Sequence, residues 1–107
     1  MDVVFHPEAL EALARLPTLE QTALSHAVEK LEALGIHLPF PHASHVRGSN
    51  SIWELRPRAG RSRWRAFYRR IGDVFVIAAV GPESQVDPAA FAQSVASAER
   101  RLDEITP

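Results

Sequence analysis

The chain has 107 residues, 46% of them apolar and 23% charged, and its twelve Lys and Arg nearly balance its thirteen Asp and Glu. This composition predicts one globular domain over residues 1–107 and excludes a protein that coats nucleic acid with its whole surface. The absence of cysteine excludes disulfides and thiolate metal sites and fits a reducing compartment. No apolar run approaches the roughly 18 residues that span a membrane, and the N-terminus has no export-signal pattern. We therefore expect no membrane contact and a cytoplasmic location.

The first third of the chain predicts a strand followed by two helices. Residues 2–5 form a short apolar, β-branched run that favours a strand. Residues 7–16 and 18–34 each repeat apolar positions at helical spacing, with Thr18 as the expected N-cap and Gly35 as the expected C-terminal cap. These two helices predict a hairpin that packs through one apolar face.

The rest of the chain predicts three strands and a final helix. Prolines and a Gly-Ser-Asn cluster indicate a loop over residues 36–50. Residues 51–58, 62–71 and 74–80 are strand-like runs separated by short turns, which favours an antiparallel meander. An Asp-Pro cap begins a helix over residues 87–105. The predicted class is α+β, in the order β-α-α-β-β-β-α.

Positive charge is concentrated in the middle of the chain. Residues 52–70, "IWELRPRAGRSRWRAFYRR", hold seven of the twelve cations, and all seven are arginines. No acid occurs from Leu55 to Gly72, whereas acids outnumber cations on either side. One-sided basic clustering of this kind is an electrostatic footprint typical of nucleic-acid binding.

Strand alternation predicts which side chains share this surface. We expect Trp64 and Tyr68 to face the helical hairpin, with Tyr68 in the core. The opposite face would then carry a positive ridge, in which an aromatic ring could stack an unpaired base and guanidinium groups could grip phosphate. The predicted RNA-binding residues of this ridge are Arg58, Arg61, Arg63, Phe67 and Arg69. The alternative is a solvated face whose arginines pair with acids of the C-terminal helix.

Several short patterns together resemble one protein family. They are "SIWELR", a glycine turn, "WRAFYR", a hydrophobic strand and a proline-capped last helix ending in "AERRLDEI". In this order and spacing the chain resembles the RelE/ParE superfamily of toxins from type II toxin–antitoxin systems, most closely its HigB-like, phage-associated branch. The resemblance covers nearly the whole chain.

The resemblance implies a toxin that enters the ribosome and cleaves mRNA, without metal or other cofactor, until a cognate antitoxin of helix-turn-helix type neutralises it. It also implies that Arg65 contacts the scissile phosphate and that Arg56 holds the neighbouring basic position. Such chemistry needs an aligned 2′-hydroxyl, positive charge at the phosphate and groups that move protons. From their positions beside the arginine strands, Glu83 and His45 are the candidate proton carriers.

An alternative function of the same fold remains open, whereas a metal site is disfavoured. The segment after the third strand of the meander, "AAVGPESQVDP", carries no cation where relatives usually carry lysines. This favours a non-nuclease toxin of the same fold, either a ParE-like gyrase inhibitor or a degenerate toxin that only binds antitoxin. A metal site at "HASH" is disfavoured because the loop has no acid and no fixed geometry.

Overall fold

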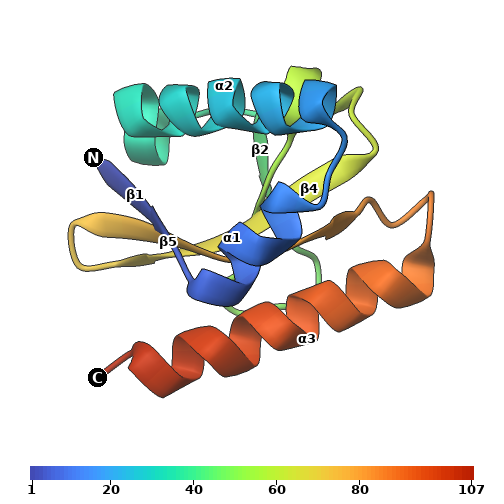
Figure 1. Ribbon diagram of the computed structural model, residues 1–107. Helices are drawn as coiled ribbons and strands as arrows, with labels where there is room; N and C mark the ends of the chain where they lie inside the picture. The colour runs from blue at the N-terminus through green and yellow to red at the C-terminus, as the bar shows by residue number, and fades with distance from the viewer.

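The computed structural model describes residues 1–107 and contains one five-stranded sheet with helices on both faces (Figure 1). The elements follow the chain as β1 (Asp2–Phe5), α1 (Pro7–Ala14), α2 (Thr18–Leu34), the 3₁₀ helix η1 (Gly35–His37), β2 (Ala43–His45), β3 (Trp53–Leu55), the 3₁₀ turn η2 (Pro57–Gly60), β4 (Trp64–Ile71), β5 (Val74–Pro82) and α3 (Pro88–Ile105). The predicted α+β class is confirmed, with one strand more than the sequence indicated.

The sheet has the order β1-β5-β4-β3-β2. Strands β2 to β5 pair antiparallel with their neighbours in sequence, so the predicted meander is confirmed. β1 lies at the edge and pairs in parallel with the first half of β5, from Asp2 opposite Val74 to Phe5 opposite Ile77. A parallel pair needs a long crossover connection, which the helical hairpin and the meander together supply.

Two strand boundaries differ from the predictions. The predicted loop over residues 36–50 contains the short strand β2, in which Ala43 pairs with Leu55. The predicted strand 51–58 ends at Leu55, because proline follows one residue later and Arg58 and Ala59 both have φ near +56°. Non-glycine residues rarely adopt this left-handed conformation, so the chain turns into η2 there.

The helix boundaries agree with the caps visible in the sequence, with one exception. Asp87 Oδ1 accepts a hydrogen bond of 3.0 Å from the backbone N–H of Ala90, and α3 begins at the following proline. Gly35 ends α2 with φ of 57°, whereas the predicted N-cap role of Thr18 is wrong because Pro17 holds that position. None of the helices combines the length and the apolarity that crossing a membrane requires.

The sheet separates two apolar cores (Figure 1). The core between the sheet and the helical hairpin contains Leu31 of α2 together with Leu55 and Tyr68 of the sheet. Burial raises the pKa of Tyr68 to about 12, and its ring meets Phe75 edge-on at 5.5 Å. Tyr68 is therefore the core residue that strand alternation predicted.

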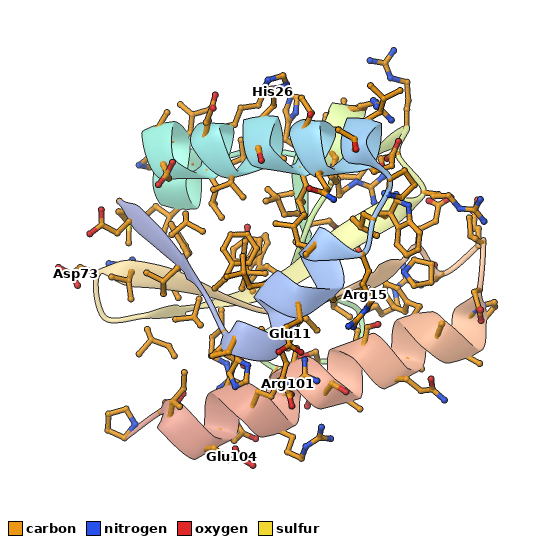
Figure 2. The ribbon with its side chains drawn as sticks, viewed as in Figure 1. Glu11, Arg15, His26, Asp73, Arg101 and Glu104 are labelled. Atoms are coloured by element: carbon orange, nitrogen blue, oxygen red, sulfur yellow. The ribbon has the colours of Figure 1, made fainter.

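The second core lies between the sheet and α3, where Phe67 packs with Ala98 and Leu102. α3 approaches so closely that a Cβ atom at Gly81 would collide with Ser94 Oγ. Figure 2 shows α3 also facing α1 through charged side chains, and Arg101 Nε lies 2.6 Å from a carboxylate oxygen of Glu8. α3 thus covers the sheet face on which the sequence predicted an open arginine ridge.

Candidate functional site

Arg65 of β4 is a buried cation, with 1% of its surface exposed. Its Nη1 donates to the carbonyl oxygens of Ser62 at 2.6 Å and Trp64 at 3.0 Å. Its Nη2 donates to the carbonyl oxygen of Gly60 at 3.2 Å and to Glu83 Oε2 at 2.8 Å. Only Nε has no hydrogen-bond partner. The guanidinium plane is therefore fixed by the backbone that precedes it and by one carboxylate.

Arg56 lies beside Arg65 and is held in a comparable way. Its Nη1 donates to Glu54 Oε1 at 2.7 Å and its Nε donates to the carbonyl oxygen of Pro41 at 2.9 Å. Its guanidinium carbon stands 5.1 Å from the centre of the Phe40 ring, within the range of a cation–π contact. The same Glu54 oxygen is 3.8 Å from Arg65 Nε, so one carboxylate bridges the two cations.

These four charged groups line a hollow of about 350 Å³, which we call the polar cleft. No apolar residue lines it, and its lining consists of Glu54, Arg56, Gly60, Arg65, Glu83, Ser84 and Gln85. The structure thus brings three sequence-predicted residues, Arg56, Arg65 and Glu83, into one site. His45 lines an adjoining hollow that shares Glu54 and Ser84 with the cleft. Its partner in the β2–β3 register is Trp53, and its ring rests edge-on against Trp53 at 5.3 Å, on the face of the sheet opposite Glu54. The structure therefore does not bring the His45 ring into the cleft.

The cleft combines a desolvated cation with balanced formal charge. Burial lowers the pKa of Arg65 and the nearby Arg56 lowers it further, while Glu54 and Glu83 act in the opposite direction. Two guanidinium groups at one place in a water-poor site favour an anion beside them. In this structure Glu54 and Glu83 supply that negative charge.

The turn that grips Arg65 is itself anchored to α2 by Glu20. One Glu20 oxygen lies 2.6 Å from Arg58 Nη1 and the other accepts a hydrogen bond of 2.7 Å from Ser62 Oγ. The hydrogen bond from Ser62, followed by that from Arg58, lowers the pKa of Glu20. Sequence analysis missed this residue, because nothing local links it to a turn 38 residues further along the chain. It also missed Glu54, although strand alternation placed Glu54 beside Arg56.

The prediction of Phe67 as an exposed stacking platform is wrong. Its side chain is fully buried and meets Phe91 of α3 edge-on, with ring centres 5.3 Å apart. Alternation put Phe67 on the correct face of β4, but α3 covers that face. Arg69, further along the same strand, donates to Asp103 of α3 at 3.0 Å. These two residues hold α3 to the sheet.

The remaining predicted RNA-binding arginines lie in or near the turn between β3 and β4. Arg58 is paired with Glu20, and Arg61 Nε donates to the carbonyl oxygen of Arg58 at 3.0 Å. Arg61 and Arg63 are exposed and have no carboxylate partner. The predicted continuous ridge is therefore wrong: the arginines separate into the cleft pair of buried Arg65 and half-buried Arg56, the ion-paired Arg58 and Arg69, and the exposed Arg61 and Arg63. No group of three or more His, Asp or Glu side chains could hold a metal ion.

Comparison with known proteins identifies the family. The model of phage-derived Gp49-like proteins matches residues 11–81, which include α2, the turn around η2 and the strands that carry the cleft. The chain belongs to the Gp49-like family. No curated protein matches it.

Solved structures show the same fold. The Gp49-like chain superposes on a mutant of the Escherichia coli toxin RelE in the free state with a TM-score of 0.60 and 17% identity, covering 89% of this chain and 94% of the other. It superposes on a chain of the intact E. coli RelBE toxin–antitoxin complex with a TM-score of 0.56 and 24% identity, covering 77% of this chain and 95% of the other. With a chain of an archaeal RelE–RelB complex from Pyrococcus horikoshii, the TM-score is 0.54 and the identity 21%, covering 76% of this chain and 92% of the other. The predicted resemblance to the RelE/ParE superfamily is confirmed as a shared fold.

Proposed function

We propose that this protein is the toxin of a type II toxin–antitoxin system and that it cleaves mRNA on the ribosome at the polar cleft. The observation that carries the proposal is the pair Arg56 and Arg65, fixed side by side in an all-polar hollow. The RelE structures that share the fold are described as toxins, two of them bound to antitoxin. We extend both properties, a toxic activity and an antitoxin partner, to this chain, which would act in the cytoplasm where translation occurs.

The cleft supplies what cleavage of RNA by its own 2′-hydroxyl requires. The 2′-oxygen attacks the adjacent phosphorus, a bond forms between them, and the bond from phosphorus to the 5′-oxygen breaks. The positive charges of the Arg65 and Arg56 guanidinium groups would offset the charge that grows on the phosphoryl oxygens. Because the backbone already orients Arg65, little reorganisation is needed during the reaction.

Protons move at both ends of this reaction. Glu83 lies against Arg65 and would accept the proton of the 2′-hydroxyl. A water molecule would supply the proton to the departing 5′-oxygen, because the ring of His45, the other predicted proton carrier, packs on Trp53 away from the cleft. Arg61 and Arg63, the exposed cations of the same turn, would hold flanking phosphates.

Induction followed by primer extension on a translated message tests the proposal. Wild type should give cuts at codon boundaries. Arg65→Lys should reduce them by about 100-fold, because an ammonium group cannot reproduce the planar array of hydrogen bonds. Arg100→Lys, at an exposed position of α3, serves as the matched control and should leave the cuts unchanged. Circular dichroism checks that both variants fold. Equal cutting by wild type and Arg65→Lys would contradict the assignment.

One observation favours a second candidate without nuclease activity, either a gyrase-directed toxin or a degenerate toxin that only binds antitoxin. Glu54 and Glu83 neutralise the cleft formally, so it lacks the excess positive charge that helps to bind RNA. A gyrase-directed toxin would induce the SOS response while message stays intact. A degenerate toxin would leave growth unchanged on induction. Either outcome would replace the nuclease proposal.

A further inference from the structure

A second hollow, which shares only Arg56 with the polar cleft, runs along α2 and has a volume of about 340 Å³. We call it the α2 groove. The wall opposite α2 is formed by Leu38, His42, Leu55, Arg56 and Arg58. Its near wall is a single stripe of α2 that consists of Leu19, Thr22, Ala23, His26, Ala27 and Lys30.

The groove carries positive charge without any carboxylate in its lining. Lys30 is exposed and forms no ion pair. Arg56 and Arg58 on the opposite wall are paired with Glu54 and Glu20, which lie outside the lining, so Lys30 is the unpaired cation of the groove. His26 and His42 add two imidazoles, and Figure 2 shows His26 on the side of α2 that faces away from α3. In a protein with a net charge of −1, an acid-free groove is a local electrostatic feature that favours an acidic partner.

The shape of the groove favours a helix as its occupant. The lining positions of α2 follow the helical repeat over twelve residues, Leu19 to Lys30, which corresponds to a wall of roughly 16 Å between the first and last Cα atoms, or three turns. Ala23 and Ala27 on this wall are small, so a second helix could approach closely. Leu19 at one end is 75% exposed, an apolar contact that no residue of this chain covers.

We propose that the α2 groove is the docking surface for an acidic, amphipathic helix of a partner protein. Apolar side chains of that helix would lie on Leu19, Ala23 and Ala27, and its carboxylates would face Lys30 and Arg58. Five of the eleven lining residues are hydrophobic, which suits a peptide better than the phosphates and bases of RNA. Identifying this partner with the antitoxin rests on the proposed function, whereas the docking surface itself does not.

A designed helical peptide tests the groove directly. The peptide has roughly 15 residues, about four turns, with leucines along one face and glutamates on both flanks. Fluorescence anisotropy should show binding that weakens as NaCl is raised to about 0.5 M. A second peptide with lysine at every glutamate position should bind at least about tenfold more weakly. Lys30→Glu should weaken binding of the acidic peptide about tenfold, and Leu19→Ser should weaken it about threefold.

Arg100→Glu is the matched control, since it reverses an exposed charge on α3 outside the groove. It should change the peptide affinity less than twofold. If Lys30→Glu and Arg100→Glu weaken binding equally, overall charge is responsible and the groove is not the site. If a single-stranded RNA of about ten nucleotides displaces the peptide, and Lys30→Glu weakens RNA binding as much as it weakens peptide binding, RNA is the occupant of the groove instead. Neither result depends on whether the protein cleaves mRNA, so the two proposals can fail separately.

Discussion

Arg65 shows how much one side chain can be constrained by its surroundings. Four of its contacts fix the two terminal nitrogens, and Glu83 provides the only carboxylate among them. An RNA phosphate that binds at Arg65 therefore has to compete with Glu83 for Nη2, because Nε is buried. The position of a single carboxylate should accordingly control both how tightly RNA binds and how fast it is cleaved.

Replacing Glu83 by glutamine separates these two effects. Loss of the charge-assisted contact to a buried guanidinium should lower the free energy of unfolding by about 1–2 kcal/mol. Affinity for a single-stranded RNA should rise a few-fold because Arg65 Nη2 is released to the phosphate. The cleavage rate of bound RNA should fall by about 100-fold if Glu83 accepts the proton. Urea unfolding, anisotropy and single-turnover cleavage measure the three quantities.

Glu104→Gln provides the comparison for this experiment. Glu104 is exposed near the end of α3 and forms no ion pair, so the substitution changes the net charge by the same amount. It should leave stability, RNA affinity and cleavage unchanged. Equal tightening of RNA binding by the two variants would mean that only net charge matters.

The turn between β3 and β4 is the element that presents Arg65, and it is strained. Arg58 and Ala59 both adopt a left-handed conformation that non-glycine residues rarely adopt. Glu20 offsets this strain by bonding Arg58 and Ser62 at either side of the turn. The ion pair between Glu20 of α2 and Arg58 thus helps to keep the carbonyl groups of the turn directed at Arg65.

The pH dependence of stability tests this anchor. Because the folded protein lowers the pKa of Glu20, its carboxylate stabilises the fold above the unfolded pKa of about 4.3 and loses that effect as pH falls through the folded value. At pH 7 the free energy of unfolding of the wild type should exceed that of Glu20→Gln by about 1 kcal/mol. The difference should shrink below about pH 4. Urea unfolding across this range measures it.

Glu29→Gln is the control for this series, since Glu29 is exposed on the same helix and has no ion-pair partner. Its stability difference from wild type should stay near zero at every pH. A pH-independent difference for Glu20→Gln would show that packing of the side chain, and not its charge, holds the turn.

The elements themselves differ in how far the sequence predicts them. α2 and α3 carry caps and long apolar stripes, so their ranges could be predicted to within a residue. β2 has only three residues in a proline-rich segment, and it forms because β3 offers a partner. No local pattern encodes that pairing. Alternation likewise placed Arg65 and Phe67 on one face of β4 but could not indicate which helix covers that face.

The candidate site was predictable in part for the same reason. Arg56 and Arg65 could be placed together because Arg56 directly follows β3 and Arg65 lies on the adjacent strand β4, with a short connection between the two strands. The carboxylates that neutralise them could not be assigned, since the contact from Arg65 to Glu83 depends on the course of the chain after β5. Likewise, Phe67 was assigned to RNA because the sequence does not reveal that the stripe of α3 packs on it.

At the scale of the whole molecule, the sheet separates the hairpin core from the α3 core. Leu31 of α2 and Leu102 of α3 are fully buried on opposite sides of it. Replacing either by valine removes one methylene group and places a β-branched residue in a helix, which should reduce the free energy of unfolding by about 1–2 kcal/mol. The effects of the two substitutions should add within about 0.5 kcal/mol, because the sites share no contact partner.

Urea unfolding of both single variants and the double variant completes this cycle. A coupling above about 1 kcal/mol would mean that strain crosses the sheet from one core to the other. In that case, occupation of the α2 groove could also alter how α3 packs.

The parallel pairing of β1 with β5 has a consequence for biosynthesis. Residues Asp2 to Phe5 have their only strand partner at Val74 to Ile77, about 70 residues later in the chain. In a growing chain, residues 2–5 therefore stay unpaired until residues 74–77 have emerged. Glu83, which closes the contact with Arg65, emerges later still. The β1–β5 pair and the Arg65–Glu83 contact therefore both form only after residues 74–83 have emerged.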